Sequence, residues 1–162
     1  MSRVLEVVGA AEESALLGEL RDLARRAKAS WGYDGDFMDR FAATMLPDRL
    51  TGPERRTWIA REDGTVVGFA IADELDHRLW LEDLWVEPAH QRHGVGRLLM
   101  DAVTGWARER GLASVDCESD PFAEPFYLAL GARRVATRPS TLAPDRSLPL
   151  MSLSLEGGSR PA

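Results

Sequence analysis

The chain has 162 residues, 44% of them hydrophobic and 28% charged, and its formal net charge is -6. This length suits a single domain around one core, and the composition lies outside the ranges of disordered and collagen-like chains. The negative charge repels phosphate backbones, so we expect no nucleic-acid partner. Since Cys117 is the only cysteine, the chain can form neither an internal disulfide nor a cysteine-built zinc site, and no metal is expected.

The N-terminal residues lack the basic start and long apolar stretch of an export signal, and no apolar run approaches the ~20 residues that cross a bilayer. We therefore expect a cytoplasmic protein with no membrane partner. We also expect one domain over residues 1–156 and a disordered tail over residues 157–162.

The first part of the chain predicts a strand, two helices and a hairpin. Apolar and β-branched residues indicate strands at residues 4–8, 57–60 and 66–71, and apolar residues recur at helical spacing over residues 11–28 and 37–45. The dipeptide Asp63-Gly64 between two of the strands is typical of a tight hairpin turn. These two strands are therefore expected to pair antiparallel.

The rest of the chain alternates strands with helices and ends in two strands. Strand patterns cover residues 79–86, 113–117, 134–137 and 150–155. Helical spacing runs from Gly94 to Gly111, and a shorter helix is expected from Pro121 to Gly131. An order that mixes hairpins with strand-helix crossovers predicts an α/β fold, with one mixed six- or seven-stranded sheet and helices on both faces.

The loop after residues 79–86 contains Gly94 and Gly96, with Arg92 and Arg97 close by. Glycines let backbone N–H groups approach a ligand closely, a helix N-terminus adds partial positive charge, and arginines add full charges. Such a loop suits a pyrophosphate, although Gly-x-Gly at a helix start can also be only a tight turn. A dinucleotide fingerprint needs a glycine where Leu99 stands, and a P-loop needs Gly-Lys-Ser/Thr. Neither a Rossmann dehydrogenase nor an NTPase is supported.

The segment Gln91-Arg92-His93-Gly94-Val95-Gly96 resembles the Gln/Arg-x-x-Gly-x-Gly/Ala signature of the GNAT superfamily of acyl-CoA N-acyltransferases. Residues 120–132, with Phe126-Tyr127 followed by Gly131-Ala132, resemble its second signature. The two segments stand in the family's order and spacing, and the strand order matches over nearly the whole chain. The resemblance implies the GNAT fold, acetyl-CoA as the cosubstrate, and acetyl transfer to a primary amine of a small molecule or a peptide.

The resemblance also implies roles for individual residues. The strand before the loop is expected to be splayed from its neighbour and to pair with the pantetheine arm, so that the Val86 N–H polarises the thioester carbonyl. Tyr127 is expected to protonate the departing thiolate. Asp120 stands where the family often has an asparagine at the cofactor; a carboxylate has no N–H to donate, so capping the following helix is its alternative role. The expected cofactor-binding residues are Leu84, Trp85, Val86, Gln91, Arg92, His93, Gly94, Val95, Gly96, Arg97, Asp120 and Tyr127.

Direct attack of an amine on a thioester requires a base to accept a proton from the incoming ammonium. Regular strand alternation would place Glu82 and Asp83 on opposite faces, with Glu82 on the face of Leu84. This alternation favours Glu82 as the catalytic base, with Glu118 and His77 as alternatives. No covalent nucleophile is required, so the lone cysteine is expected to be a core residue.

Three aromatic residues between the first two helices, Trp31, Tyr33 and Phe37, are expected to line an acceptor pocket. They could instead form a separate hydrophobic cluster. Asp83 and Glu118 are the expected acidic substrate-binding residues. Carboxylates in the pocket would favour a small amine or polyamine-like acceptor over an acidic one.

Two other classes of function fit parts of the sequence. One is a non-catalytic acyl-CoA-binding regulator on the same fold, and the other is an interaction module in which Gly94-Val95-Gly96 is only a turn. Tyr127 and the complete glycine loop argue against the first, and failure to bind coenzyme A would favour the second. A homodimer is compatible with a small sheet domain that has edge strands, although no motif in the sequence specifies one.

Overall fold

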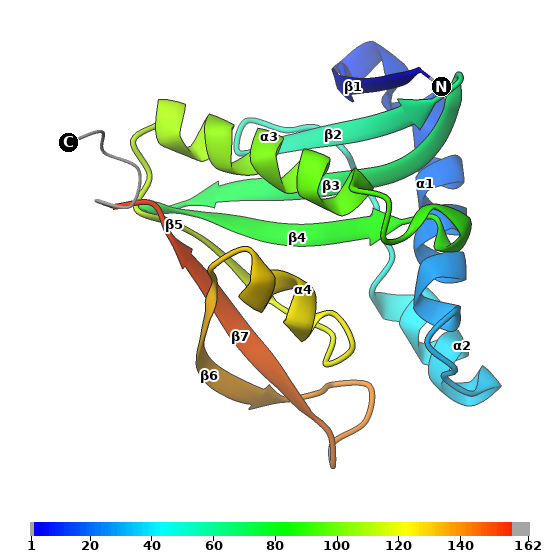
Figure 1. Cartoon of the computed structure of the whole chain (residues 1–162). Coiled ribbons are helices and arrows are strands. Elements are labelled where there is room, and N and C mark those ends of the chain that lie inside the picture. Colours follow the sequence, from blue (N-terminus) through cyan, green and yellow to red (C-terminus); the bar gives the residue numbers. More distant parts are fainter. Residues whose placement is uncertain (1, 157–162) are drawn as a thin grey trace.

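The computed structural model describes residues 2–156, which form a seven-stranded sheet flanked by helices (Figure 1). The tail over residues 157–162, for which disorder was predicted, lies outside the described residues. No helix within residues 2–156 is both long and apolar enough to span a membrane. The elements in chain order are β1 (Arg3–Val7), α1 (Glu13–Ala29), α2 (Gly35–Thr44), β2 (Arg55–Glu62), β3 (Thr65–Leu75), β4 (Arg78–Val86), α3 (Val95–Glu109), β5 (Ser114–Glu118), α4 (Glu124–Ala129), β6 (Arg133–Pro139) and β7 (Ser147–Ser154), with short 3-10 helices at Ala10–Glu12 and Pro88–His90.

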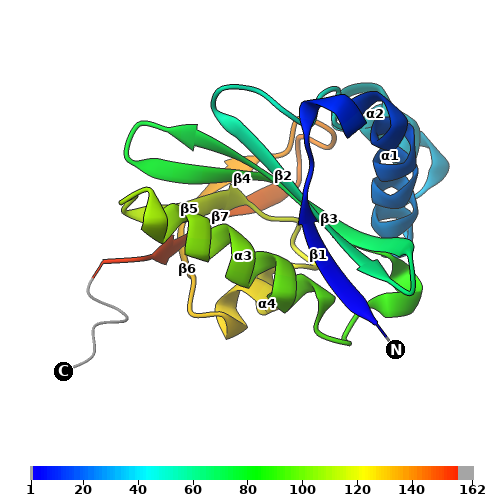
Figure 2. The same cartoon turned by 90° about the horizontal axis from the view of Figure 1, so that it is seen from above.

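The sheet has the strand order β1-β2-β3-β4-β5-β7-β6. All neighbouring strands are antiparallel except β4 and β5, which are parallel and are joined through α3. Figure 2 shows α1 and α2 on one face of the sheet and α3 and α4 on the other. The predicted α/β fold, with a mixed sheet and helices on both faces, is therefore confirmed.

Each face of the sheet has its own apolar core. In α3, Val95, Leu99 and Val103 recur every four residues, so they form one buried stripe that packs on the sheet. On the other face, Leu20 and Leu23 of α1 belong to a second cluster with residues of β2 and β3. The two cores fix both helix layers against β4, the strand on which the candidate site is built.

The helix expected to start at Pro121 begins three residues later, and this expectation is wrong. Residues 121–123 form a turn, and α4 starts at Glu124. The Phe122 N–H donates to Asp120 Oδ1 at 2.7 Å, a local side-chain bond that favours a turn over a helix. Asp120 therefore stabilises the turn between β5 and α4 and does not cap α4.

The strands β4 and β5 pair over only a short stretch and then diverge (Figure 1). Their register joins Arg78, Leu79 and Trp80 to residues 114–116. Beyond Trp80, β4 continues to Val86 alongside β3, whereas β5 stays paired with β7. The sheet thus opens into a V whose gap has the last residues of β4 on one side and β5 on the other.

Candidate active site

A β-bulge lies in the middle of β4. In the pairing with β3, Ile71 faces Asp83 and Ala72 faces Leu81, which leaves Glu82 as the extra residue. A bulge of this kind shifts the alternation of side chains by one position. Leu81 and Leu84 consequently pack on the same core, and the side chains of Glu82 and Asp83 line the same cavity. The expected alternation, with Glu82 and Asp83 on opposite faces and Glu82 beside Leu84, is therefore wrong.

A cavity of about 280 Å³ adjoins the bulge, and we call it the acceptor cavity. Its walls come from α1, α2 and the segment that follows it, the first residue of β2, β4, the end of β5 and the residues after it, the β6–β7 connection, and the start of β7. The lining residues with charged side chains are Lys28, Asp48, Arg55, Glu82, Asp83, Glu118, Asp120 and Arg146. The cavity therefore combines an excess of carboxylates with direct access to β4.

Asp83 is the most deeply buried of the carboxylates on β4, with 7% of its surface exposed. The Trp85 indole Nε1–H donates to Asp83 Oδ1 at 2.9 Å. Burial raises the pKa of Asp83 to about 7, against the effect of this hydrogen bond and with the support of the neighbouring Glu82 charge. A carboxyl group that titrates near neutral pH in a cavity is suited to accept and release protons.

The open edge of β4 presents unpaired backbone groups toward the gap. The Glu87 N–H donates to the Val67 carbonyl of β3 at 2.8 Å. Because backbone groups alternate along a strand, the N–H groups of Leu84 and Val86 point the other way, toward β5. The Val86 carbonyl on this edge accepts from Gln91 Nε2 at 3.2 Å. The edge can thus accept an extended ligand that pairs as a strand would.

The glycine loop connects this edge to the N-terminus of α3. Arg92 has φ +66° and Gly94 has φ +87°, so the loop makes a tight left-handed turn at the start of the helix. Arg3 of β1 braces the loop by donating from Nη1 to the His93 carbonyl at 3.0 Å. A Cβ on Gly96 would lie only 3.0 Å from the Phe126 ring, so glycine permits the close approach of α3 and α4. This geometry fits a pyrophosphate bound by backbone N–H groups at the N-terminus of α3.

Tyr127 on α4 approaches the gap from the face opposite the acceptor cavity. Its side chain is buried, and its hydroxyl contacts the thiol of Cys117. Burial raises the pKa of Tyr127 well above its ordinary value, and the contact with the Cys117 side chain and the nearby Asp83 carboxylate add to the shift. Tyr127 is therefore protonated at any physiological pH. Burial also raises the pKa of Cys117 to about 12, which suits the core position expected for it.

The three aromatic residues expected at the acceptor pocket surround an amine of the chain itself. Trp31, Tyr33 and Phe37 lie with Phe41 and Trp85 around the Lys28 ammonium, whose Nζ is 5.0–5.9 Å from the five ring centroids. Of these rings, Phe41 and Trp85 line the acceptor cavity. Phe41 was missed as a cavity residue, although it lies one helical turn after Phe37 and shares its face.

Of the remaining residues expected at the site, two line the acceptor cavity and one lies far from it. Glu118 lines the acceptor cavity and pairs with Arg138 at 3.0 Å. Asp120 also lines it, with both carboxylate oxygens engaged by other groups of the chain. His77 lies in the β3–β4 turn, at the opposite end of β4 from Val86, and so lies far along the strand from the gap.

Comparison with known proteins identifies the class that combines this fold and site. Residues 17–132 match the Acetyltransferase (GNAT) family, and the chain belongs to this family. Membership of this family is what the two signatures predicted. A 61-residue stretch is 41% identical to streptothricin acetyltransferase of Streptomyces lavendulae. That stretch covers 36% of this chain and 32% of the relative, so the match spans about a third of the relative's length.

Solved structures share the fold over nearly the full length. The PaiA N-acetyltransferase of Thermoplasma acidophilum, solved with coenzyme A, has a TM-score of 0.79 and 15% identity and covers 95% of this chain and 99% of its own. The ribosomal-protein-S18-alanine N-acetyltransferase of Escherichia coli has a TM-score of 0.70 and 21% identity, covering 99% and 100% of the two chains. Nourseothricin acetyltransferase has a TM-score of 0.69 and 23% identity, covering 95% and 99%.

Proposed function

We propose that the protein transfers an acetyl group from acetyl-CoA to a primary amine of a cationic acceptor, by direct attack in a ternary complex. Related folds have been solved with coenzyme A, among them an aminoglycoside 6'-N-acetyltransferase and the PaiA enzyme. The glycine loop and the open edge of β4 suit the pyrophosphate and the pantetheine arm. Acetyl-CoA supplies a reactive thioester, and the chain supplies the binding and proton transfers around it.

The single observation that carries the proposal is the position of Asp83, a buried carboxyl in the acceptor cavity whose pKa lies near 7. An amine enters such a site as an ammonium ion and must lose a proton before it can attack. Asp83 is the better candidate for the base, since Glu82, favoured by the sequence, is exposed. Glu82 keeps a supporting role, because its charge helps to hold the pKa of Asp83 high.

Two further groups would act on the opposite side of the reacting carbon. The Val86 N–H on the open edge of β4 would donate to the thioester oxygen, where negative charge develops. Tyr127 would deliver its proton to the departing sulfur, and its raised pKa keeps that proton available. Asp83 and Tyr127 would therefore act as base and acid on either side of the gap.

The acceptor class follows from the charges that face the cavity. Within residues 2–156, no salt bridge joins Asp48, Glu82 or Asp83 to a cation, whereas Lys28 and Arg146 already share Asp120. The free carboxylates would attract a positively charged amine and repel an acidic substrate. A volume of about 280 Å³ suits a small molecule or a flexible amine arm. Streptothricin and nourseothricin acetyltransferases, by their names, act on small molecules.

The test is a thiol-release screen of the purified protein with acetyl-CoA against amines of varied size and charge. We expect turnover with cationic amines, and a rise of kcat/KM with pH through about 7 as Asp83 loses its proton. Asp83→Asn should lower kcat by roughly a hundredfold or more and remove that pH step. Glu82→Gln is the matched control and should cost roughly tenfold at most while moving the step to lower pH. Equal losses in both variants, or no release with any amine, would contradict the proposal.

A further inference from the structure

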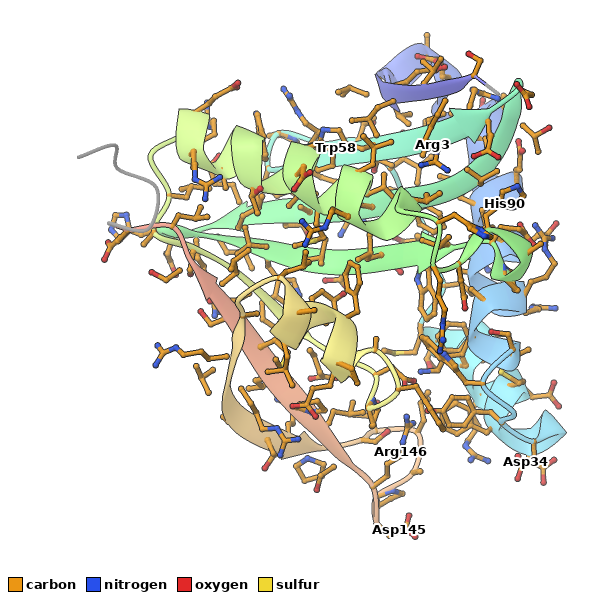
Figure 3. The ribbon with its side chains drawn as sticks, in the orientation of Figure 1. Arg3, Asp34, Trp58, His90, Asp145 and Arg146 are labelled. Atoms are coloured by element: carbon orange, nitrogen blue, oxygen red, sulfur yellow. The ribbon has the colours of Figure 1, made fainter. Side chains whose placement is uncertain are left out.

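Asp120 lies at the centre of a network that joins four separate parts of the chain. Its Oδ2 accepts from Lys28 Nζ of α1 at 2.5 Å, from the Tyr33 hydroxyl between α1 and α2 at 2.8 Å, and from Arg146 Nη2 of the β6–β7 connection at 3.2 Å. Arg146 Nη2 also donates to the Tyr33 hydroxyl. We call these four residues the Asp120 network. Figure 3 labels Arg146 and its exposed neighbour Asp145 on the β6–β7 connection.

The network is buried and contains more positive than negative charge. The side chains of Lys28 and Asp120 are 8% and 5% exposed, and that of Arg146 is 20% exposed. Burial lowers the pKa of Lys28, and the Asp120 carboxylate opposes this shift. Two cations thus depend on one carboxylate, and removing its charge would leave both without a counterion in a poorly solvated place.

Arg146 connects this buried charge to a wall of the acceptor cavity. The β6–β7 connection contributes Ser140, Thr141, Leu142 and Arg146 to the lining. The segment closes on itself, since the Ser140 N–H donates to the Arg146 carbonyl at 2.7 Å. The Arg146 guanidinium also lies over the Tyr33 ring, 4.6 Å from its centroid. The position of this wall therefore follows the position of Arg146.

We propose that Asp120 is a positioning residue of the acceptor site: through Lys28 and Arg146 it fixes the β6–β7 connection against the aromatic rings around Lys28 and so sets the shape of the acceptor cavity. This inference rests on the proposed function. It gives Asp120 an effect on the acceptor and none on the donor. The alternative is the direct contact with the cofactor that the family resemblance implied.

Steady-state kinetics separate the two roles, with the best amine of the thiol-release screen as the acceptor. Asp120→Asn should raise the acceptor KM by about tenfold or more and leave the acetyl-CoA KM within about twofold of the wild type. Asp145→Asn removes an exposed carboxylate from the same connection and should change neither KM. A raised acetyl-CoA KM, or two unchanged KM values, would overturn the inference.

The double variant Lys28→Met with Asp120→Asn tests whether geometry or charge is responsible. It keeps the net charge of the cavity and removes the buried unpaired cation at Lys28, so it should fold where Asp120→Asn alone fails. Arg146 still lacks its carboxylate in this variant, so the acceptor KM should stay raised. If the KM returns to the wild-type value, the effect of Asp120 is electrostatic and the positioning role is wrong.

Hydrogen exchange gives a readout that does not require any acceptor. The amide of Ser140 and its neighbours in the β6–β7 connection should exchange about tenfold or more faster in Asp120→Asn, with Asp145→Asn as the control. This result would hold even if no amine were acetylated, so a failure of the proposed function is distinguishable. Unchanged exchange over residues 140–146 in both the single and the double variant would contradict the inference.

Discussion

Asp83 and Tyr127 approach the gap between β4 and β5 from opposite faces of the sheet. Asp83 lines the acceptor cavity on the α1 and α2 face, whereas Tyr127 belongs to the core beneath α3. Burial raises the pKa of both groups, but with different results. A carboxyl group with a pKa of about 7 can accept and release protons near neutral pH, whereas a phenol with a pKa well above 10 stays protonated. In the proposed mechanism, the same physical effect prepares a base on one face and an acid on the other.

The acid role predicts a clear result for Tyr127→Phe. Turnover should fall by roughly ten- to ten-thousandfold, because the thiolate would leave without a positioned proton donor. The affinity for acetyl-CoA, measured by calorimetry, should be little changed, since the ring and its packing are retained. Unaltered turnover with a good acceptor would show that the proton comes from elsewhere.

At the scale of the elements, local patterns in the sequence predict most of the fold. The expected hairpin at Asp63-Gly64 is present, with φ values of +51° and +84° at these residues, as a tight hairpin turn requires. The bulge in β4 was missed, although the sequence carries a signal for it. Core-facing apolar residues run at 79 and 81 and then at 84 and 86, and this three-residue step is what an inserted residue produces.

The Asp120 network could not be predicted, because its members lie far apart in the chain. Lys28, Asp120 and Arg146 meet only when α1, the β5–α4 turn and the β6–β7 connection are packed together. Nothing in the local sequence of Lys28, on a helix rich in arginine, marks it as buried. The arrangement of Trp31, Tyr33 and Phe37 was missed for the same reason, since these rings surround Lys28, which sequence spacing did not connect to them. The cofactor-binding roles of the glycine loop and Asp120 stay predictions.

The contact between β3 and α3 gives a prediction about stability. A Cβ on Gly68 would lie 2.8 Å from Val95 Cγ1 and 3.1 Å from the Trp85 carbonyl oxygen, both of which are held in place. Gly68→Ala should therefore destabilise the fold by about 1–3 kcal/mol, because α3 must move away from the sheet. Gly105→Ala on α3 is the control, with no atom within 4 Å of the added carbon, and should stabilise the fold by up to about 1 kcal/mol. Urea unfolding measures both changes, and equal effects would contradict the packing argument.

At the scale of the whole molecule, the sheet consists of two parts that share a narrow junction. The strands β1 to β4 form one part and β5 to β7 the other, and the ladder between them runs over residues 78–80 of β4. A helix layer covers each face, but the gap between the parts opens toward the glycine loop (Figure 1). A ligand that pairs with the open edge of β4 and is bound by the loop would occupy this gap and link the two parts.

Coenzyme A should therefore stabilise the protein and protect specific amides from exchange. At a hundredfold excess over its Kd, the ligand should add about 2.7 kcal/mol, which for a chain of this size raises Tm by roughly 5–10 °C. Hydrogen exchange should slow at the Leu84 and Val86 amides, which face the gap, and at the first amides of α3. The Trp85 amide, which points toward β3, serves as the internal control. Arg97→Gln should weaken binding and lessen its dependence on salt, since it removes a charge that the proposed binding mode places near the pyrophosphate. Stabilisation without protection at residues 84 and 86 would place the ligand elsewhere on the molecule.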